Sequence, residues 1–295
     1  MYGLRKRDES ALELSNMLEK QPSRTALGAA AHRAVHQKRD EGRIFKDPLA
    51  QLILGPDADA IIKELAPGAV MDTLCMFIAA RSRFAEDCLS HAISRRVGQL
   101  VILGAGLDTL SLRKPHEKAG LLTFEVDHPA TQAWKRRRLT EVGLVPPASL
   151  TFVPVNLEEQ SLPAELKAAG LDTNRTTFFH WLGVAPYLRV GLVIETLEFI
   201  AGIPGAEVVF DYTEPLENYA PERRASIIAV QSRAEEVGEP WLSFFDPCEI
   251  HSKINELGLR VIEDLGLREI RLRYLGSQDT YFGAGPHVIH AARPE

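Results

Sequence analysis

Three successive apolar segments of the chain end in small or polar residues that are suited to holding a nucleotide. The first ends in Gly104-Ala105-Gly106, where glycines let a backbone approach a ligand closely. The second ends in Asp127, about 20 residues further on, where a carboxylate can accept hydrogen bonds from ribose hydroxyls. The third ends in Asn156, whose amide has both an acceptor and a donor and could bind an adenine edge. The pattern therefore predicts a nucleotide site at one edge of a sheet.

The missing third glycine helps to identify the nucleotide. A dinucleotide fingerprint requires GxGxxG, and Thr109 stands where the third glycine would be. A glycine turn without it, followed by Asp127 and Asn156, fits S-adenosylmethionine better than NAD. Each residue also has an ordinary structural explanation, since Asp127 could cap the following helix and Asn156 a turn. Glu125, two residues before Asp127 on the same strand face, is the rival for the ribose contact.

Later strand ends carry the candidates for acid–base chemistry or for the wall of a second pocket. His180 could titrate near neutral pH, although a hydrogen-bonded core histidine is the alternative. Tyr187 and Tyr212 could shape an acceptor pocket or pack in the core. A hydroxyl acceptor benefits from a general base, whereas a carboxylate acceptor needs none.

The first part of the chain, residues 1–95, is predicted to be helical. Apolar residues recur at helical spacing over residues 9–20, and Ser23 could cap a second helix. Asp47-Pro48 is typical of a cap followed by proline at the first helical position, and Met76–Arg96 predicts a long helix. We expect this part to pack on the rest of the chain as a helical lid.

From residue 96 onward, short apolar runs alternate with helical segments. This alternation predicts an α/β fold with a mostly parallel sheet of seven to eight strands and helices on both faces. The last two strands are close in sequence and could form an antiparallel edge. Strands are predicted at Leu100–Leu103, Leu122–Val126, Leu150–Val155, Thr177–Trp181, Glu207–Tyr212, Arg260–Leu265, Arg271–Leu275 and His287–Ala291. Residues 96–295 are thus expected to form one core unit that binds ligands at the carboxyl ends of its strands.

Composition excludes several function classes. The net charge of −6 argues against general nucleic-acid binding, and the densest basic run, Lys135–Arg138, is expected to be a solvated helix face. Three cysteines far apart in sequence indicate neither a disulfide framework nor a metal site. The chain shows no signal peptide and no apolar run long enough to span a bilayer, so we expect a cytoplasmic protein without a membrane partner. The oligomeric state is not readable from the sequence.

Several stretches in order give the chain a recognisable resemblance. It resembles the leucine carboxyl methyltransferase-like family of S-adenosylmethionine-dependent methyltransferases, especially the bacterial O-methyltransferase branch. The matching stretches, spread over most of the chain, are RTALGAAAHRA, IFKDPLAQLIL, IAARSRFAED, VILGAGLDTLSLR, FEVDHPATQAWKRRRL, FVPVNLEEQSL, WLGVAPYL and GEPWLSFFDPCEI. The resemblance implies a Rossmann-like class I methyltransferase fold.

The resemblance also implies roles for individual residues. Arg81 matches an arginine that pairs with the methionyl carboxylate of the cofactor, which suits a guanidinium group. Gly104 and Gly106 match the turn beneath the methionine and ribose parts, and Asp127 matches the ribose-binding carboxylate. Methyl transfer to an oxygen of a small molecule is the expected reaction.

Two departures from the family pattern qualify this expectation. Asn156-Leu157 stands where the family has an Asp-Leu pair that holds adenine, so the full charge is missing. Leu182 stands where carboxyl methyltransferases of the family often have a glutamate, which puts protein carboxyl methylation in doubt more than cofactor binding. The alternatives are a protein C-terminal carboxyl methyltransferase, an NAD(P)-dependent reductase and a cofactor-binding protein without catalysis.

Overall fold

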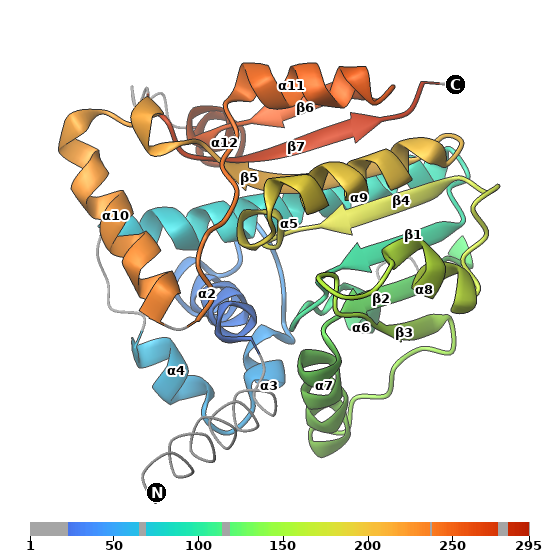
Figure 1. Ribbon diagram of the computed structural model, residues 1–295. Coiled ribbons are helices and arrows are strands. Elements are labelled where there is room, and N and C mark those ends of the chain that lie inside the picture. The colour runs from blue at the N-terminus through green and yellow to red at the C-terminus, as the bar shows by residue number, and fades with distance from the viewer. Residues whose placement is uncertain (1–22, 65–68, 114–118, 237, 277–282, 295) are drawn as a thin grey trace, which may run out of the picture.

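The fold is built on one seven-stranded sheet (Figure 1). The computed structural model describes residues 23–64, 69–113, 119–236, 238–276 and 283–294, so the helix predicted over residues 9–20 lies outside the described residues. The strands are β1 (Gln99–Leu103), β2 (Leu122–Asp127), β3 (Leu150–Pro154), β4 (Thr177–Trp181), β5 (Glu207–Thr213), β6 (Arg260–Leu265) and β7 (Pro286–Ala292). Their order in the sheet is β3-β2-β1-β4-β5-β7-β6.

Strands β1 to β5 are parallel, and β7 runs antiparallel between β5 and β6. Strands β1, β4 and β5 are buried along their whole length, which explains why their sequences are apolar rather than alternating. The predicted mostly parallel sheet with an antiparallel edge is confirmed, and with it the Rossmann-like arrangement of strands and helices.

The prediction of an eighth strand at Arg271–Leu275 is wrong. These residues form the end of helix α12 (Leu267–Leu275), which closes at Gly276 in a left-handed conformation with φ of 62°. The alternation of arginines with apolar residues imitated a strand. The apolar side chains that the fold buries are instead Leu267 and Ile270, one helical turn apart, whereas Leu272 is 57% exposed.

Helices cover both faces of the sheet. One face packs against α8 (Leu162–Ala168), α9 (Val190–Gly202) and α11 (Pro247–Glu256), and the other against α5 (Ala69–Ser94), α6 (Leu110–Arg113) and α12. The remaining elements after β1 are α7 (Pro129–Glu141), α10 (Pro221–Glu236) and the 3-10 turns η2 (Ala185–Tyr187) and η3 (Leu216–Asn218). Within the described ranges, no helix is long and apolar enough to cross a membrane.

Among the residues that the structure describes, three helices precede α5, namely α2 (Arg24–Asp40), α3 (Ala50–Leu54) and α4 (Ala58–Glu64). Ser23 caps α2 as predicted, because its hydroxyl accepts a hydrogen bond from the Ala26 amide at 3.1 Å. The helix predicted to start at Asp47-Pro48 begins only at Ala50. The boundary at residue 95 stays a prediction, and α5 lies directly on β4, β5 and β7.

A buried carboxylate joins these helices to the glycine turn after β1. Asp47 accepts from the Arg33 guanidinium at 2.8 Å and from the Thr109 hydroxyl at 2.8 Å. Arg33 also donates to the Leu107 carbonyl at 2.7 Å. Thr109, in the place of the third glycine, thus supplies a hydroxyl that a glycine lacks. Helix α2 is held over the carboxyl ends of β1 and β4 by this cluster (Figure 1).

We predict that Asp47→Ala lowers the free energy of unfolding by about 3–5 kcal/mol, because it leaves the buried Arg33 charge without its partner. The matched control is Asp59→Ala, which removes a carboxylate that is 81% exposed and paired with Lys38. That change should cost less than about 1 kcal/mol. Urea unfolding of both variants checks this, and equal losses would contradict the structural role of Asp47.

Candidate functional site

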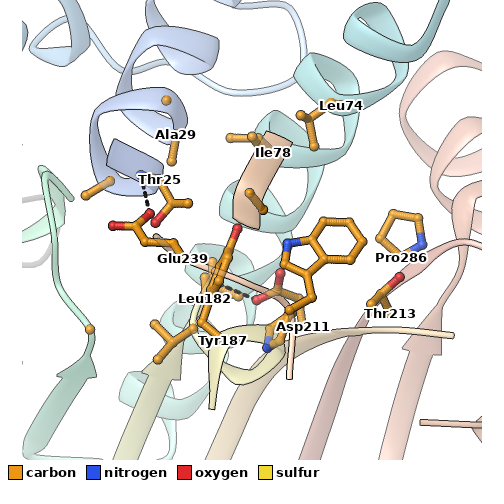
Figure 2. A pocket seen from close by; sticks show the side chains of 18 of the residues that line it. Thr25, Ala29, Leu74, Ile78, Leu182, Tyr187, Asp211, Thr213, Glu239 and Pro286 are labelled. Carbon is orange, nitrogen blue, oxygen red and sulfur yellow. Dashed lines mark hydrogen bonds between the residues drawn. The ribbon is translucent and has the colours of Figure 1, made fainter. Parts of the chain in front are cut away.

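A cavity of about 810 Å³ lies at the carboxyl ends of β1, β2, β4 and β5, between helices α2, α5 and α10 (Figures 1 and 2). This volume is within the range of small-molecule and cofactor sites. The predicted glycine turn, Arg81, Asp127, His180, Tyr187 and Tyr212 all line it. The parallel strands therefore bring together most of the residues that the sequence indicates.

The glycine turn is shaped by close contacts with the chain itself. Gly104 has φ of 62°, and a Cβ there would lie 2.2 Å from a methyl carbon of Val184. Gly106 has φ of 44°, and its Cβ would lie 3.0 Å from that of Ala26 on α2. Ala105, between them, is buried and donates from its amide to the Val126 carbonyl at 3.0 Å. The two glycines are needed because α2 and the turn after β4 pack tightly here.

Asp127 projects into the cavity from the end of β2. One carboxylate oxygen accepts from the Gly106 amide and the other from the His128 amide at 2.7 Å. Burial raises the pKa of Asp127 to about 6 despite these hydrogen bonds. The cap of α7 is His128, which accepts from the Ala130 amide, so the helix-cap explanation of Asp127 is wrong.

Glu125, the rival carboxylate, does not line this cavity. It is fully buried and forms an ion pair with Lys135 at 2.7 Å. The solvated face predicted for the basic run is therefore wrong at its first residue, since Lys135 is only 1% exposed. A buried glutamate needs a buried cation, and α7 supplies it.

The predicted adenine residues occupy a turn beside the cavity. Asn156 accepts from the Glu158 amide at 3.1 Å through its side chain, which matches the turn-capping alternative. Leu157 packs partly buried against the core of the sheet. The cavity lining includes Glu158 but neither Asn156 nor Leu157. No sequence motif indicated Glu158 as a lining residue.

Arg81 reaches the cavity from α5 and is not a surface residue. Its guanidinium donates to Asp211 at the end of β5 at 2.5 Å, and the second oxygen of Asp211 accepts from the Gly183 amide at 2.5 Å. A Cβ on Gly183 would lie 2.7 Å from the Arg81 guanidinium, and its φ of 72° also suits glycine. Arg81 is thus held in place by β5 and by the turn after β4.

The three candidates for acid–base chemistry differ in their surroundings. His180 is 2% exposed, and burial lowers the pKa of its imidazole. Burial likewise raises the pKa of the Tyr187 phenol. The Tyr212 hydroxyl donates to Asp264 at 2.6 Å and its ring stacks on His287 with centroids 4.9 Å apart. Burial, together with Asp264, raises the pKa of Tyr212.

Residues 238–245, which follow α10, lie along one wall of the cavity. They contact α2 at one end and η2 at the other. Glu239 accepts from the amides of Arg24 and Thr25 at 3.1 and 2.8 Å, and Figure 2 shows Glu239 next to Thr25. The Leu242 amide donates to the Pro186 carbonyl at 2.6 Å. Trp241 of this segment lines the cavity. The attachment of the segment to α2 had no signal in the sequence.

The part of the cavity between α5 and α10 is rich in apolar side chains, although Arg223, Ser226 and Arg233 of α10 line it as well. We call this part the apolar chamber, and its apolar side chains are Leu74, Phe77, Ile78, Ile227, Val230 and Trp241. Leu74 and Ile78 come from one face of α5, opposite Tyr187 and Asp211 (Figure 2). The cavity therefore combines a polar inner part at the strand ends with the apolar chamber.

The polar inner part fits an adenosyl amino acid. A carboxylate on β2 suits ribose hydroxyls, and a guanidinium on α5 suits an amino-acid carboxylate. A tight glycine turn between them leaves room for the chain that connects the two. The third glycine of a dinucleotide turn, which allows close helix–strand packing, is absent, and Thr109 in its place donates a hydrogen bond to Asp47.

Comparison with known proteins agrees with this geometry. A family model described as leucine carboxyl methyltransferase matches residues 26–201. The protein YktD of Bacillus subtilis is 29% identical over 306 residues, which cover 94% of this chain and all of YktD. A Mycolicibacterium paratuberculosis protein is 31% identical over 219 residues, covering 68% of this chain and 67% of its own. Both are named, provisionally, as S-adenosyl-L-methionine-dependent methyltransferases.

Structural comparison supports the fold alone. A DUF574 family protein from Streptomyces avermitilis aligns with a TM-score of 0.58 and 13% identity, over 94% of this chain and 100% of that one. The family match favours methyl transfer over the reductase alternative. The chain therefore belongs to the leucine carboxyl methyltransferase family and is an S-adenosylmethionine-dependent methyltransferase.

Proposed function

We propose that this protein methylates a carboxylate or hydroxyl oxygen of an apolar small molecule. The observation that carries the proposal is the apolar chamber, which continues directly from the polar inner part of the cavity. A chamber rich in apolar and aromatic side chains suits a small apolar acceptor.

Four residues of the inner part would hold the cofactor. We place its ribose at Asp127, its amino-acid carboxylate at Arg81 and its central part over Gly104 and Gly106. When bound, S-adenosylmethionine supplies a methyl group activated by the sulfonium. Asp127 and Arg81 are already held by neighbouring groups, so little reorganisation is needed when a ligand arrives.

The chain's own contribution to transfer is to orient the acceptor and to exclude water. Because burial raises the pKa of Tyr187, its phenol stays protonated at neutral pH and can donate to an acceptor oxygen. Tyr212 is committed to Asp264 and forms part of the wall. Helix α2, as part of the proposed lid of residues 1–95, is closed over the site through Glu239.

The proposal is tested by methyl transfer from radiolabelled S-adenosylmethionine to a panel of apolar aromatic and aliphatic acids, their alcohol and phenol counterparts, and a peptide that ends in leucine. We expect labelled esters or ethers of small apolar acceptors. Labelling of the peptide alone would instead favour protein carboxyl methylation, and failure to bind S-adenosylhomocysteine would remove the cofactor assignment.

Filling the apolar chamber should impair acceptor use without affecting the cofactor. We predict that Ile227→Trp lowers kcat/KM for the best acceptor of the panel by about ten- to a hundredfold, because displaced reactants lose alignment. The affinity for S-adenosylhomocysteine should be unchanged. The control is Ile228→Trp on the same helix, since Ile228 is 47% exposed and does not line the cavity. Equal effects of both variants would argue against the chamber as the acceptor site.

Cofactor affinity should depend on the ionisation of Asp127. Its pKa in the free protein is about 6, and the ionised form accepts hydrogen bonds from the ribose. Affinity is therefore full above this pKa and falls as pH drops through it, by about tenfold between about pH 8 and about pH 5. Calorimetric titration with S-adenosylhomocysteine checks this. In Asp127→Asn the affinity should be low and lack this pH dependence; a persisting dependence would assign it to another group.

A further inference from the structure

The inner end of the cavity contains a histidine that the proposed function leaves without a role. His180 lies on β4 in register with Ile102 of β1 and Val209 of β5. Side chains alternate along a strand, so His180 shares the sheet face of Phe178, the face that α5 covers. His180 is 2% exposed, and both it and Ile102 line the cavity.

One ring nitrogen of His180 is buried without the hydrogen-bond partner that a buried polar atom normally has. The atom is Nδ1, which is buried and has no hydrogen-bond partner on any other described residue. Buried polar side-chain atoms nearly always have a partner, so an atom that lacks one beside a cavity indicates a group that arrives with the ligand. Because burial lowers the pKa of His180, the ring is neutral and offers one nitrogen as an acceptor.

Asp108, the residue that follows the glycine turn, lies near this ring. Its carboxylate lines the same cavity, and one oxygen accepts from the Leu110 amide at 2.6 Å. Burial by itself would raise the pKa of Asp108, but the positive charges of His180, when it is protonated at low pH, and then of Arg33 outweigh it and lower the pKa to about 2. The inner end of the cavity therefore presents an ionised carboxylate together with a neutral acceptor.

The opposite charge is supplied from α5. Arg81 lines the cavity and is paired with Asp211, whose two oxygens are taken by Arg81 and by the Gly183 amide. Leu182, also in the lining, is apolar and cannot receive a cation. A cationic group that enters this end thus finds its acceptors at Asp108 and His180, and a carboxylate finds its donor at Arg81.

We propose that His180 and Asp108 together receive the ammonium group at the amino-acid end of the cofactor. A zwitterionic amino acid matches a site that has a guanidinium on one side and a carboxylate with a neutral imidazole on the other. His180 is then a cofactor-binding residue and not the base for the acceptor. The inference rests on the cofactor assignment that the proposed function also uses, and it does not depend on the acceptor.

The test compares two ligands on the full chain by isothermal titration calorimetry near neutral pH. One is S-adenosylhomocysteine, and the other is its analogue with hydrogen in place of the amino group. In the unaltered protein the first should bind about ten- to a hundredfold more tightly, since a hydrogen bond from a charged donor is lost in the second. In His180→Phe that ratio should shrink severalfold, because the ring remains but the acceptor is gone.

His180→Gln is the matched variant, because its amide oxygen is an acceptor of similar reach. We expect it to restore most of the ratio. Since each ratio is taken within one variant, a general loss of packing affects both ligands and cancels. A second measurement uses 5′-methylthioadenosine, which lacks the amino-acid end, and its affinity should be the same in all three proteins.

Two outcomes would overturn the inference. The ratio could stay the same in His180→Phe, which would show that the ammonium group is received elsewhere. Alternatively, all three ligands could weaken equally in His180→Phe and His180→Gln, which would show a packing role. If the unaltered protein bound none of the three ligands, the cofactor assignment itself would fail, and that result is distinct from either of these.

Discussion

A buried ion pair, Asp47 with Arg33, is the interaction on which the shape of the site depends. It lies between α2 and the glycine turn, and Thr109 adds a third group to it. This cluster attaches α2 to the glycine turn, and Glu239 attaches the start of α2 to residues 238–245, so both contribute to the wall that α2 provides. A buried charge that has a close partner is tolerated, whereas one that is left alone is not, so the three residues act as a unit.

The same principle recurs inside the cavity, where two charged groups are oriented by partners. Asp127 is held by two backbone amides, and Arg81 is held by Asp211. Such groups keep their geometry before a ligand binds, which lowers the cost of ordering them. The neutral ring of His180 differs from them, since its Nδ1 has no partner on another described residue, and this is the basis for assigning it to the amino-acid end of the cofactor.

The features that depend on a local sequence pattern could be predicted from the sequence. The glycine turn and Asp127 follow apolar strands, and parallel strands bring such ends together. The pattern misled at Arg271–Leu275, where alternating arginines imitate a strand although the buried spacing is helical. Glu239 was missed as a fastening of α2, because its partners are more than 200 residues away in sequence. Contacts between residues so far apart in sequence form only in the folded chain, so a single sequence does not predict them.

The most direct test of the account is a crystal structure of the protein with S-adenosylhomocysteine. We predict that the ligand lies in the cavity at the ends of β1, β2 and β4, with its ribose hydroxyls at Asp127, its carboxylate at Arg81 and its sulfur toward the apolar chamber. A ligand bound outside this cavity, or one whose ribose contacts neither oxygen of Asp127, would contradict the account.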